Sequence, residues 1–294
     1  MSATLFDRVA LIGIGLIGSS LARVLRRDSP QTTIVACARS TETLDVVQRL
    51  GLADETGNDP AVAVAGADLV VIATPLSAYA EIGRRVAPAL GEGAIVTDVG
   101  SVKGAVIRDL APLLPGRIHF VPGHPVAGTE HSGPEAGFAE LFHDRWCILT
   151  PPPGTAPEAV AKVTALWEGA GMRVVTMEAE HHDRVMAVTS HLPHLIAYTI
   201  VGTATELGQD LQSEVVAYSA GGFRDFTRIA ASDPVMWRDI FLENREAVLE
   251  LLQRFSEDLT ALQRAIRRGD GETLHKWFTR TRAIRRSIIE AKQA

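Results

Sequence analysis

The 294-residue chain is poor in cysteine and in aromatic residues: it has two cysteines, and Phe, Trp and Tyr together make up 5%. Cys37 and Cys147 each lie in an apolar, strand-like run. Two such residues cannot supply the framework of a disulfide-rich secreted domain or of a zinc ribbon. We expect two buried free thiols in a protein from a reducing compartment.

The chain also lacks an excess of positive charge, since 29 Lys and Arg stand against 35 Asp and Glu, a net charge of −6. Nucleic-acid binding needs a basic surface that neutralises phosphates, so we expect no nucleic-acid partner. The N-terminus, MSATLFDRVALIG, runs into a strand-like segment without a signal-peptide pattern. No apolar run is as long as a membrane span. These features predict a cytoplasmic protein without a membrane partner.

The sequence does have enough apolar residues for a large core, at 46% hydrophobic and 22% charged. Strand-like runs alternate with helical segments at residues 9–14, 33–38, 68–74, 94–100, 119–123 and 147–151, and one more helix and strand end near residue 178. Several runs are continuous Val, Ile and Leu, which is typical of strands buried on both faces of a parallel sheet. The alternation predicts a doubly wound, Rossmann-type α/β domain.

The strand signal disappears after residue 179, and the rest of the chain has helical periodicity. One helical face is formed by apolar residues three or four positions apart: Val248, Leu251, Leu252, Phe255, Leu259, Leu262 and Ile266. We therefore predict an N-terminal α/β domain at residues 1–179 and an all-helical domain at residues 180–294. The absence of a long Gly/Ser linker suggests that the two domains pack closely.

A glycine-rich turn follows the first strand in the segment GIGLIG. Gly13, Gly15 and Gly18 form the pattern G-x-G-x-x-G, with Leu16 and Ile17 between the second and third glycines. Glycines here permit a tight turn and let the backbone approach a pyrophosphate at a helix N-terminus. The pattern alone is common in tight turns, but its place between a strand and a helix predicts a dinucleotide site.

The end of the second strand indicates which dinucleotide is bound. NAD-binding domains normally have a carboxylate here for the ribose hydroxyls, whereas this chain has Ala38 followed by Arg39, Ser40 and Thr41. Arg39 could pair with a 2′-phosphate, and Ser40 and Thr41 could donate hydrogen bonds to it. We predict NADP as the preferred cofactor, with NAD possible because Arg39 could instead stack on the adenine of either dinucleotide.

Further polar residues follow strands at the ligand-binding edge of the predicted sheet. Thr74–Pro75 ends the third strand-like run and is expected to border the dinucleotide. Ser101 and Lys103 follow the fourth run, and His124 follows the fifth. A neutral imidazole at this edge is a suitable general base for an alcohol proton, although a single loop histidine can also be merely solvated.

Four further histidines raise the question of a metal site: His181, His182, His191 and His194. The segment SHLPH lacks the glutamate of H-E-x-x-H and spaces its histidines by three positions instead of four. We therefore predict no metal site.

The motifs GIGLIG, TDVGSVKG, GHPVAGTEHSG, SHLPH and GGFRDFTRIAASDPVMWRDIFLEN together resemble those of the prephenate/arogenate (cyclohexadienyl) dehydrogenases of tyrosine biosynthesis. The resemblance covers nearly the whole chain, and the last three motifs are specific to that family. It implies an oxidative decarboxylation with NAD(P)+, which would convert prephenate to 4-hydroxyphenylpyruvate or arogenate to tyrosine. The resemblance leaves both substrates open.

The resemblance also implies roles for individual residues. His124 matches the catalytic histidine that takes the ring hydroxyl proton, and Ser101 matches the serine that holds this histidine and the nicotinamide in register. Arg228 matches an arginine that binds a substrate carboxylate. Other matched residues surround the substrate: Ser190 and His194 beside its side chain, Asp225 and Trp237 as gate and wall of the helical domain, and Glu130 as an ion-pair partner of Arg228.

The resemblance further implies a homodimer formed through the helical domain, and the apolar face at 248–266 is more than a small helical domain can bury alone. Two other functions fit parts of the sequence. Another two-domain NADP-dependent oxidoreductase of a small hydroxy or imino acid would not need Ser101, His124 and Arg228 together. A non-catalytic dinucleotide sensor would keep GIGLIG and could lose His124.

Overall fold

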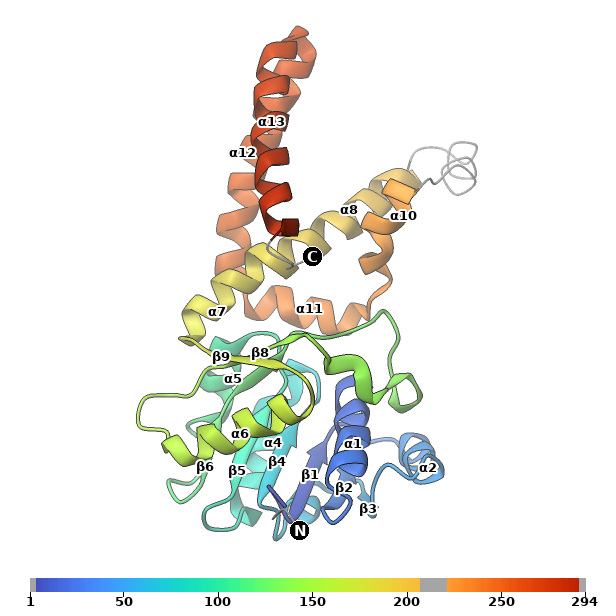
Figure 1. Ribbon diagram of the computed structural model, residues 1–294, viewed down its shortest axis with the longest axis vertical. Helices are drawn as coiled ribbons and strands as arrows, with labels where there is room; N and C mark the ends of the chain where they lie inside the picture. The colour runs from blue at the N-terminus through green and yellow to red at the C-terminus, as the bar shows by residue number, and fades with distance from the viewer. Residues whose placement is uncertain (1–3, 207–220, 291–294) are drawn as a thin grey trace. The chain divides into compact units, whose positions relative to one another are not determined.

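A computed structural model describes residues 4–206 and 221–290 (Figure 1). The chain divides into two compact units, Met1–Arg245 and Glu246–Ala294. The first unit holds both β-sheets and the helices that precede residue 245. The predicted domain boundary near residue 179 coincides with the start of a helix, and the helices that follow as far as residue 243 belong to the same compact unit as the sheets.

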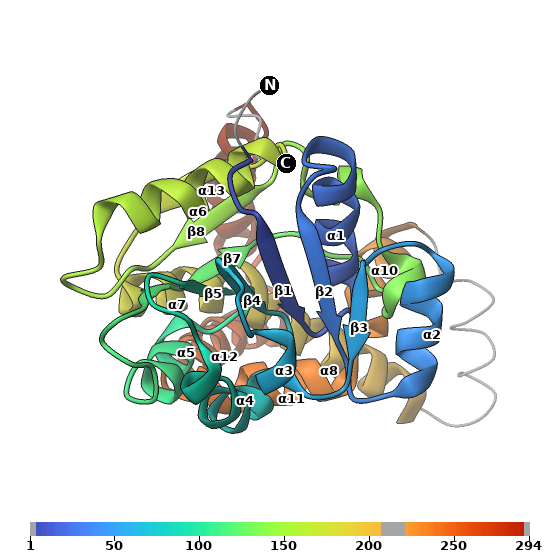
Figure 2. The same ribbon diagram turned by 90° about the horizontal axis from the view of Figure 1, so that it is seen from below.

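The main sheet has six strands in the order β3-β2-β1-β4-β5-β6, and every neighbouring pair is parallel (Figure 2). Its strands are β1 (Arg8–Ile12), β2 (Thr33–Cys37), β3 (Glu55–Gly57), β4 (Leu69–Ile72), β5 (Ile95–Asp98) and β6 (His119–Val121). This is the strand order of the doubly wound dinucleotide-binding fold, which confirms the predicted fold class. The order reverses between β1 and β4, where such sheets bind their ligands.

The sheet is buried on both faces, as its continuous apolar strands predicted. In β1, Val9 and Leu11 belong to one core cluster, while Ala10 and Ile12 belong to the other. The first cluster includes side chains of α1 (Leu16–Asp28), α2 (Thr41–Arg49) and α6 (Pro157–Gly169). The second includes those of α3 (Pro60–Ala63), α4 (Tyr79–Val86) and α5 (Lys103–Leu110). Burial of each such aliphatic side chain stabilises the fold by roughly 1.5–3 kcal/mol. The two core clusters therefore hold the strand ends at the ligand-binding edge of the sheet in place.

The structure also has a second sheet, which the sequence analysis did not predict. It consists of β7 (Gly123–Pro125), β8 (Trp146–Leu149) and β9 (Arg173–Thr176), with β7 antiparallel to β8 and β8 parallel to β9. The predicted strand at 119–123 is interrupted at Pro122, so β6 and β7 join different sheets. The sequence analysis also missed β3, because Glu55, Thr56 and Gly57 show no apolar pattern.

After the last strand, the first unit continues with α7 (Ala179–Met186), which runs through the π-helical turn η5 (Ala187–His191) into α8 (Leu192–Glu206). They end with α10 (Gly221–Thr227), η6 (Arg228–Ala231) and α11 (Pro234–Glu243). Short 3₁₀ turns complete the unit: η1 (Leu76–Ala78), η2 (Ala87–Ala89), η3 (Pro134–Ala136) and η4 (Ala139–Phe142). Trp237 and Ile240 of α11 pack in the same core cluster as α4 and α5, which places α11 beside the main sheet domain.

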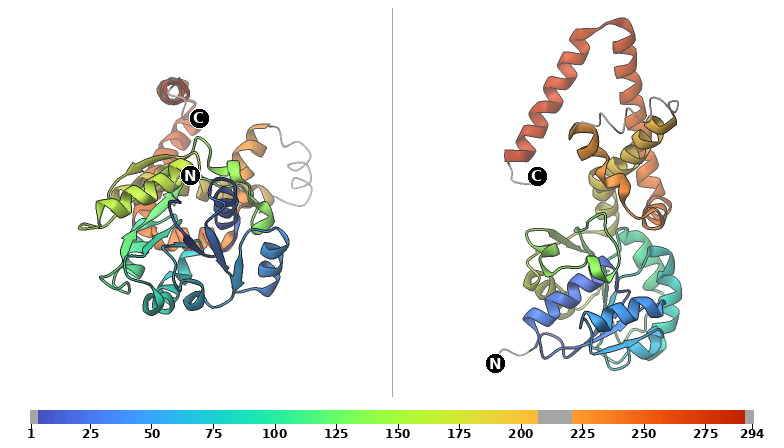
Figure 3. Two further views of the ribbon diagram at one scale, coloured as in Figure 1. Left: turned by 60° about the horizontal axis from the view of Figure 1, so that its bottom comes forward. Right: turned by 90° about the vertical axis from the view of Figure 1, so that its right-hand side faces the viewer.

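The second unit consists of most of α12 (Arg245–Arg268) and of α13 (Gly271–Glu290). The two helices meet at a turn where Gly269 has φ 66°, and they diverge from it (Figure 3). Several large apolar side chains on them are exposed, including Leu259 and Phe278. The predicted helical character of the C-terminal part is thus confirmed for the described residues.

The stretch Ala179–Glu206 is long and apolar. It forms one 28-residue helical segment that reaches a mean hydropathy of 1.3, so by length and composition it could cross a membrane. The sequence analysis expected no apolar run as long as a membrane span. One helix of this kind is weak evidence of a span, since core helices of globular proteins meet the same criteria.

A buried ion pair connects the two sheets. The Lys103 ammonium donates hydrogen bonds to the Asp98 carboxylate at the end of β5 and to the carbonyl of Gly123 in β7. The same carboxylate accepts hydrogen bonds from the Tyr79 hydroxyl and from the backbone N–H groups of Gly100 and Gly123. Both charged side chains are fully buried. Burial lowers the pKa of Lys103, and the neighbouring carboxylate opposes that shift. Removing either partner would leave an uncompensated charge in the core.

We predict that Lys103→Met lowers the free energy of unfolding by about 3–5 kcal/mol, because the Asp98 carboxylate stays buried without its counter-ion. The measurement is urea unfolding at neutral pH. The double variant Lys103→Met/Asp98→Asn should recover much of the loss, since it removes both charges. The control is Arg85→Gln, whose ion pair with Asp59 is about half exposed and should contribute less than about 1 kcal/mol. Equal midpoints for Lys103→Met and Arg85→Gln would contradict the prediction.

Candidate functional site

The glycine turn after β1 has the shape of a pyrophosphate site. Gly13 has φ 97°, and a Cβ there would lie 2.5 Å from the carbonyl oxygen of Ala73. A Cβ on Gly18 would collide with the Gly13 carbonyl, whereas the space beside Gly15 is open. Gly15 caps α1 without any side-chain hydrogen bond, so N–H groups of the first helical turn remain available to an anion. The residues present therefore fit a dinucleotide.

Two predicted cofactor residues lie beside this turn. Thr74 follows β4, its methyl group adjoins the position of Gly13, and its buried hydroxyl has no hydrogen-bond partner among the described residues. Pro75 is exposed next to it. Leu16 and Ile17, in the first turn of α1, are partly buried against the core. The unpartnered hydroxyl of Thr74 is available to a ligand that occupies this edge of the sheet.

The adenosine end of the predicted site lies after β2. Arg39 is exposed and makes no ion pair within residues 4–206 and 221–290. The Ser40 hydroxyl accepts a hydrogen bond from the Thr43 N–H as the cap of α2, and it donates a 3.4 Å hydrogen bond to the Glu42 carboxylate. Sequence reasoning did not consider Glu42. Its negative charge lies next to the residues that were expected to bind a 2′-phosphate.

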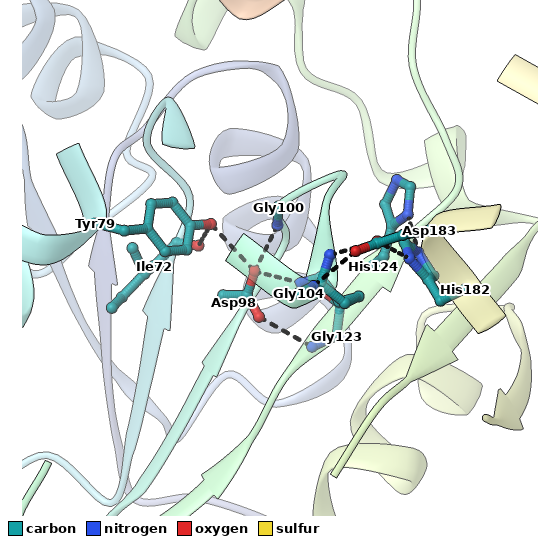
Figure 4. Close-up of polar contacts among 10 residues, drawn as sticks. Ile72, Tyr79, Asp98, Gly100, Gly104, Gly123, His124, His182 and Asp183 are labelled. Carbon is teal, nitrogen blue, oxygen red and sulfur yellow. Dashed lines mark hydrogen bonds and ion pairs between the residues drawn. The ribbon is translucent and has the colours of Figure 1, made fainter. Parts of the chain in front are cut away.

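His124 lies within β7 and not in the loop that the sequence analysis expected. Its side chain is buried, with 8% of the residue exposed. Its Nδ1 lies 2.8 Å from Nε2 of His182, and Nδ1 of His182 lies 2.8 Å from a carboxylate oxygen of Asp183 (Figure 4). That carboxylate also accepts hydrogen bonds from the backbone N–H groups of Lys103 and Gly104 at the start of α5. A chain of hydrogen bonds thus runs from His124 to a helix N-terminus.

Burial keeps the imidazoles of His124 and His182 neutral near pH 7. Burial lowers the pKa of His124 well below its usual value, and the neighbouring His182 and Lys103 lower it further. Burial also lowers the pKa of His182, against the opposing effect of Asp183. A neutral imidazole has one nitrogen that can accept a proton. His124 can therefore act as a base, which is the property that the sequence analysis required of it.

Ser101 was expected to hold His124 in register, but the two do not bond to each other. Ser101 is half-buried just before α5, and its hydroxyl makes no hydrogen bond among the described residues. His182 is the hydrogen-bond partner of His124 instead. The hydroxyl of Ser101 remains available for a bound molecule.

Arg228 and Glu130 form the ion pair that was predicted for them. A guanidinium nitrogen of Arg228 lies 3.3 Å from a carboxylate oxygen of Glu130, which joins η6 to the loop after β7. The Arg228 side chain is 58% exposed and that of Glu130 is 33% exposed, so an anionic ligand could reach the guanidinium. Asp225, on α10, is exposed and makes no hydrogen bond within the described parts of the chain.

His194 and Trp237 stack on each other, with ring centroids 3.6 Å apart and planes inclined by 22°. Nδ1 of His194 donates a hydrogen bond to the Ser190 carbonyl, which leaves Nε2 as the acceptor. Trp237 is 5% exposed, so it forms a buried wall behind the histidine. The SHLPH segment therefore directs His194 to α11, while His191 is buried against Asn244.

No group of three or more His, Cys, Asp or Glu side chains could hold a metal ion within residues 4–206 and 221–290. Cys37 and Cys147 are buried free thiols, as predicted. Burial raises the pKa of Cys37 to about 11 and raises that of Cys147 further. Neither thiol is therefore a reactive thiolate near neutral pH.

Comparison with known proteins identifies the family. Residues 21–176 match the model of the prephenate dehydrogenase nucleotide-binding domain, and residues 178–280 match that of the prephenate dehydrogenase dimerization domain. A cyclohexadienyl dehydrogenase of Zymomonas mobilis is 44% identical over 285 residues, which is 97% of each chain. The chain belongs to the prephenate dehydrogenase family.

Solved structures of prephenate dehydrogenase relatives have the same fold. The enzyme from A. aeolicus, in complex with hydroxyphenyl propionate and NAD+, is 37% identical with a TM-score of 0.88, covering 98% of this chain and 99% of that one. The arogenate dehydrogenase of Synechocystis is 29% identical with a TM-score of 0.78, covering 95% and 98%. Membership of the prephenate dehydrogenase family makes this chain an oxidoreductase.

Sequence reasoning missed two residues of this candidate site. It considered His182 only as a possible metal ligand, and it did not consider Asp183. The signal that could have found them is the pair His182-Asp183 in the first turns of the helix after β9. Their partners lie 58 and 80 positions away in sequence, so no local pattern shows that they meet.

Proposed function

We propose that this chain catalyses the oxidative decarboxylation of prephenate, arogenate or both with NAD(P)+, and that His124 is the general base. The observation that supports this most strongly is the buried, neutral His124, which follows β6 of the main sheet and lies within hydrogen-bond distance of His182. The relatives named above support the same reaction class. A sensor that only bound dinucleotide would not need such a base.

The proposed reaction places the following demands on the protein. The ring carbon that bears the hydroxyl loses a hydride, which a bound nicotinamide dinucleotide accepts. His124 takes the hydroxyl proton as the hydride leaves, because negative charge develops on that oxygen in the transition state. The bond to the ring carboxylate then breaks, CO2 leaves, and its electron pair makes the ring aromatic. Proton return to the phenol oxygen restores neutral His124.

The remaining predicted residues bind and orient the substrate in this proposal. Arg228 binds a substrate carboxylate, by resemblance the ring carboxylate, and a planar guanidinium is suited to a bidentate grip. It exchanges its Glu130 partner for the substrate. Ser101 positions the reacting groups near the nicotinamide. The residues proposed to line the rest of the substrate site are Ser190, His194, Asp225 and Trp237.

For the cofactor, we propose a preference for NADP over NAD. The support is the absence of a ribose-binding carboxylate at Ala38 and the exposed cation of Arg39 beside it. The Glu42 carboxylate, which lies near Ser40, opposes phosphate binding and provides a further test. The residues proposed to bind the dinucleotide are Gly13, Gly15, Leu16, Ile17, Gly18, Arg39, Ser40, Thr74, Pro75 and Ser101.

We also propose that residues 1–179 bind the dinucleotide, and that residues 180–294 bind substrate and form a cytoplasmic homodimer. The family model for the dimerization domain supports this division. Further support comes from apolar side chains of α12 that are more than half exposed in the single chain: Leu249, Leu259 and Ile266. Exposed apolar surface of this kind is typical of a subunit interface.

His124→Asn is expected to lower kcat by about 10²–10⁴-fold, the usual contribution of a general base, and to leave cofactor binding intact. Steady-state kinetics with prephenate and arogenate, and fluorescence titration of the cofactor, measure the two effects. The control is His181→Asn, an exposed histidine on α7, which should retain wild-type kcat. A His124→Asn variant with near-normal kcat would remove the base from this proposal.

Arg228→Gln is expected to raise KM for the substrate by roughly ten- to a hundredfold, because a charge-assisted hydrogen bond contributes about 1.5–3 kcal/mol. Cofactor affinity should not change. Glu130→Gln removes the competing carboxylate and keeps Arg228, so its effect on substrate KM should be much smaller than that of Arg228→Gln. If KM stays flat while the melting temperature of Arg228→Gln collapses, Arg228 is structural.

The cofactor proposal is tested by kcat/KM for NADP+ and NAD+. Wild type should prefer NADP+ by roughly ten- to a hundredfold. Arg39→Ala should erode this preference, Ala38→Asp should reverse it, and Glu42→Gln should increase it by removing a repulsive charge. A wild type that prefers NAD+, together with an Arg39→Ala variant that behaves identically, would show that this strand end does not select NADP+.

The assembly proposal predicts a dimer by light scattering at micromolar concentration. Leu259→Glu places a charge in the exposed apolar face and should shift the mass toward that of a monomer. Arg264→Glu introduces the same side chain at an exposed polar position of α12 and should remain dimeric. A fully active wild-type monomer would contradict the proposal.

A further inference from the structure

We propose that Asp183 and His182 are positioning residues that fix the tautomer of His124, so that its Nε2 is the nitrogen that accepts the substrate proton. The consequence for catalysis rests on the proposed function. The tautomer itself is a property of the protein without substrate and can be measured separately.

The first step of the argument is the carboxylate. Asp183 accepts two backbone hydrogen bonds of 2.8 Å, from the N–H groups of Lys103 and Gly104 at the start of α5. A helix N-terminus stabilises negative charge, and an ionised carboxylate can only accept hydrogen bonds. The 2.8 Å contact between its oxygen and Nδ1 of His182 therefore requires the proton to be on that nitrogen.

The second step passes this constraint through His182 to His124. His182 is fully buried, and burial lowers its pKa, so near neutral pH it carries a single ring proton. With that proton on Nδ1, its Nε2 is an acceptor. Nδ1 of His124, 2.8 Å away, must then be the donor. Figure 4 shows the three side chains in this order.

The third step concerns the free nitrogen. His124 is neutral near pH 7 because burial lowers its pKa, and its one proton is on Nδ1. Nε2 therefore carries the lone pair. It makes no hydrogen bond with the described residues, and it is not fully buried. A lone pair in this position is free to accept a proton from a bound hydroxyl.

The same chain of hydrogen bonds also stabilises the charged form of His124. When the hydroxyl proton reaches Nε2, the resulting imidazolium still donates through Nδ1 to His182, and His182 donates to the carboxylate of Asp183. The positive charge is thus coupled to an anion within a buried environment, where electrostatic interactions are strong. The proton returns from Nε2 to the phenol oxygen after CO2 has left, so the cycle consumes no proton.

The test uses ¹⁵N NMR of the imidazole nitrogens in the full-length protein with bound cofactor, together with kinetics. Wild-type His124 should show a protonated Nδ1 and an unprotonated Nε2. In Asp183→Asn, the amide offers only one oxygen to three N–H donors, so the tautomer of His182, and with it that of His124, is no longer fixed. Loss of a carboxylate that sets a catalytic histidine tautomer costs up to about 10⁴-fold in kcat. We expect at least about a 10²-fold loss in Asp183→Asn, with substrate KM within about threefold.

A matched pair of His182 variants separates tautomer control from packing. His182→Gln keeps a carbonyl that can accept the hydrogen bond from Nδ1 of His124, whereas His182→Leu has a similar volume and no acceptor. We expect Gln to retain kcat within about tenfold of wild type and Leu to lose at least about 10²-fold. The control Asp54→Asn changes a carboxylate that accepts a backbone N–H from Ile34, away from this chain, and should keep wild-type kcat.

Two results would overturn the inference: a wild-type His124 protonated on Nε2, or Gln and Leu variants with equal kcat and unchanged imidazole spectra. Failure of the proposed function has a different signature. In that case the wild-type spectra would show the expected tautomer, while the protein would turn over neither prephenate nor arogenate with either dinucleotide.

Discussion

The buried ion pair between Lys103 and Asp98 is the interaction on which the site depends. Asp98 ends strand β5, and Lys103 begins α5. Together they hold both backbone polar groups of Gly123, the residue before His124. The backbone N–H groups of Lys103 and Gly104 hold Asp183 from the helical segment that follows the sheets. The segment from Asp98 to Gly104 thereby positions His124, the proposed base, from the sheet side and its hydrogen-bond partners from the helical side.

This arrangement explains why polar and charged groups are buried here at considerable cost. A buried charge is tolerated only where it is paired and hydrogen-bonded, and each of these carboxylates accepts several N–H donors. A network satisfied in this way has little freedom to rearrange. Rigidity suits a general base that has to stand within hydrogen-bond reach of one substrate hydroxyl. The groups proposed for the substrate periphery, Arg228 and Asp225, are by contrast exposed.

Much of the fold followed from local patterns. Continuous apolar strands predicted the parallel sheet, GIGLIG predicted the open turn at Gly15, and helical periodicity predicted the C-terminal helices. Local patterns also failed at particular elements. β3 has no apolar pattern, and the break at Pro122 sends His124 into a second sheet, because strand pairing depends on partners distant in sequence. In the site, the predicted Glu130–Arg228 pair is present, whereas His182, Asp183 and Glu42 were missed.

The sequence alone determined the fold class and the glycine turn after β1, and it singled out His124 as the candidate base, because each is encoded in residues close together in the chain or in family motifs. The tertiary structure alone decided what surrounds that histidine. His124 meets His182 across 58 positions, and Asp183 meets Lys103 across 80. Hydrogen bonds and burial between such distant residues exist only once the sheets and helices have packed. They determine which imidazoles stay neutral and which nitrogen is free to accept a proton.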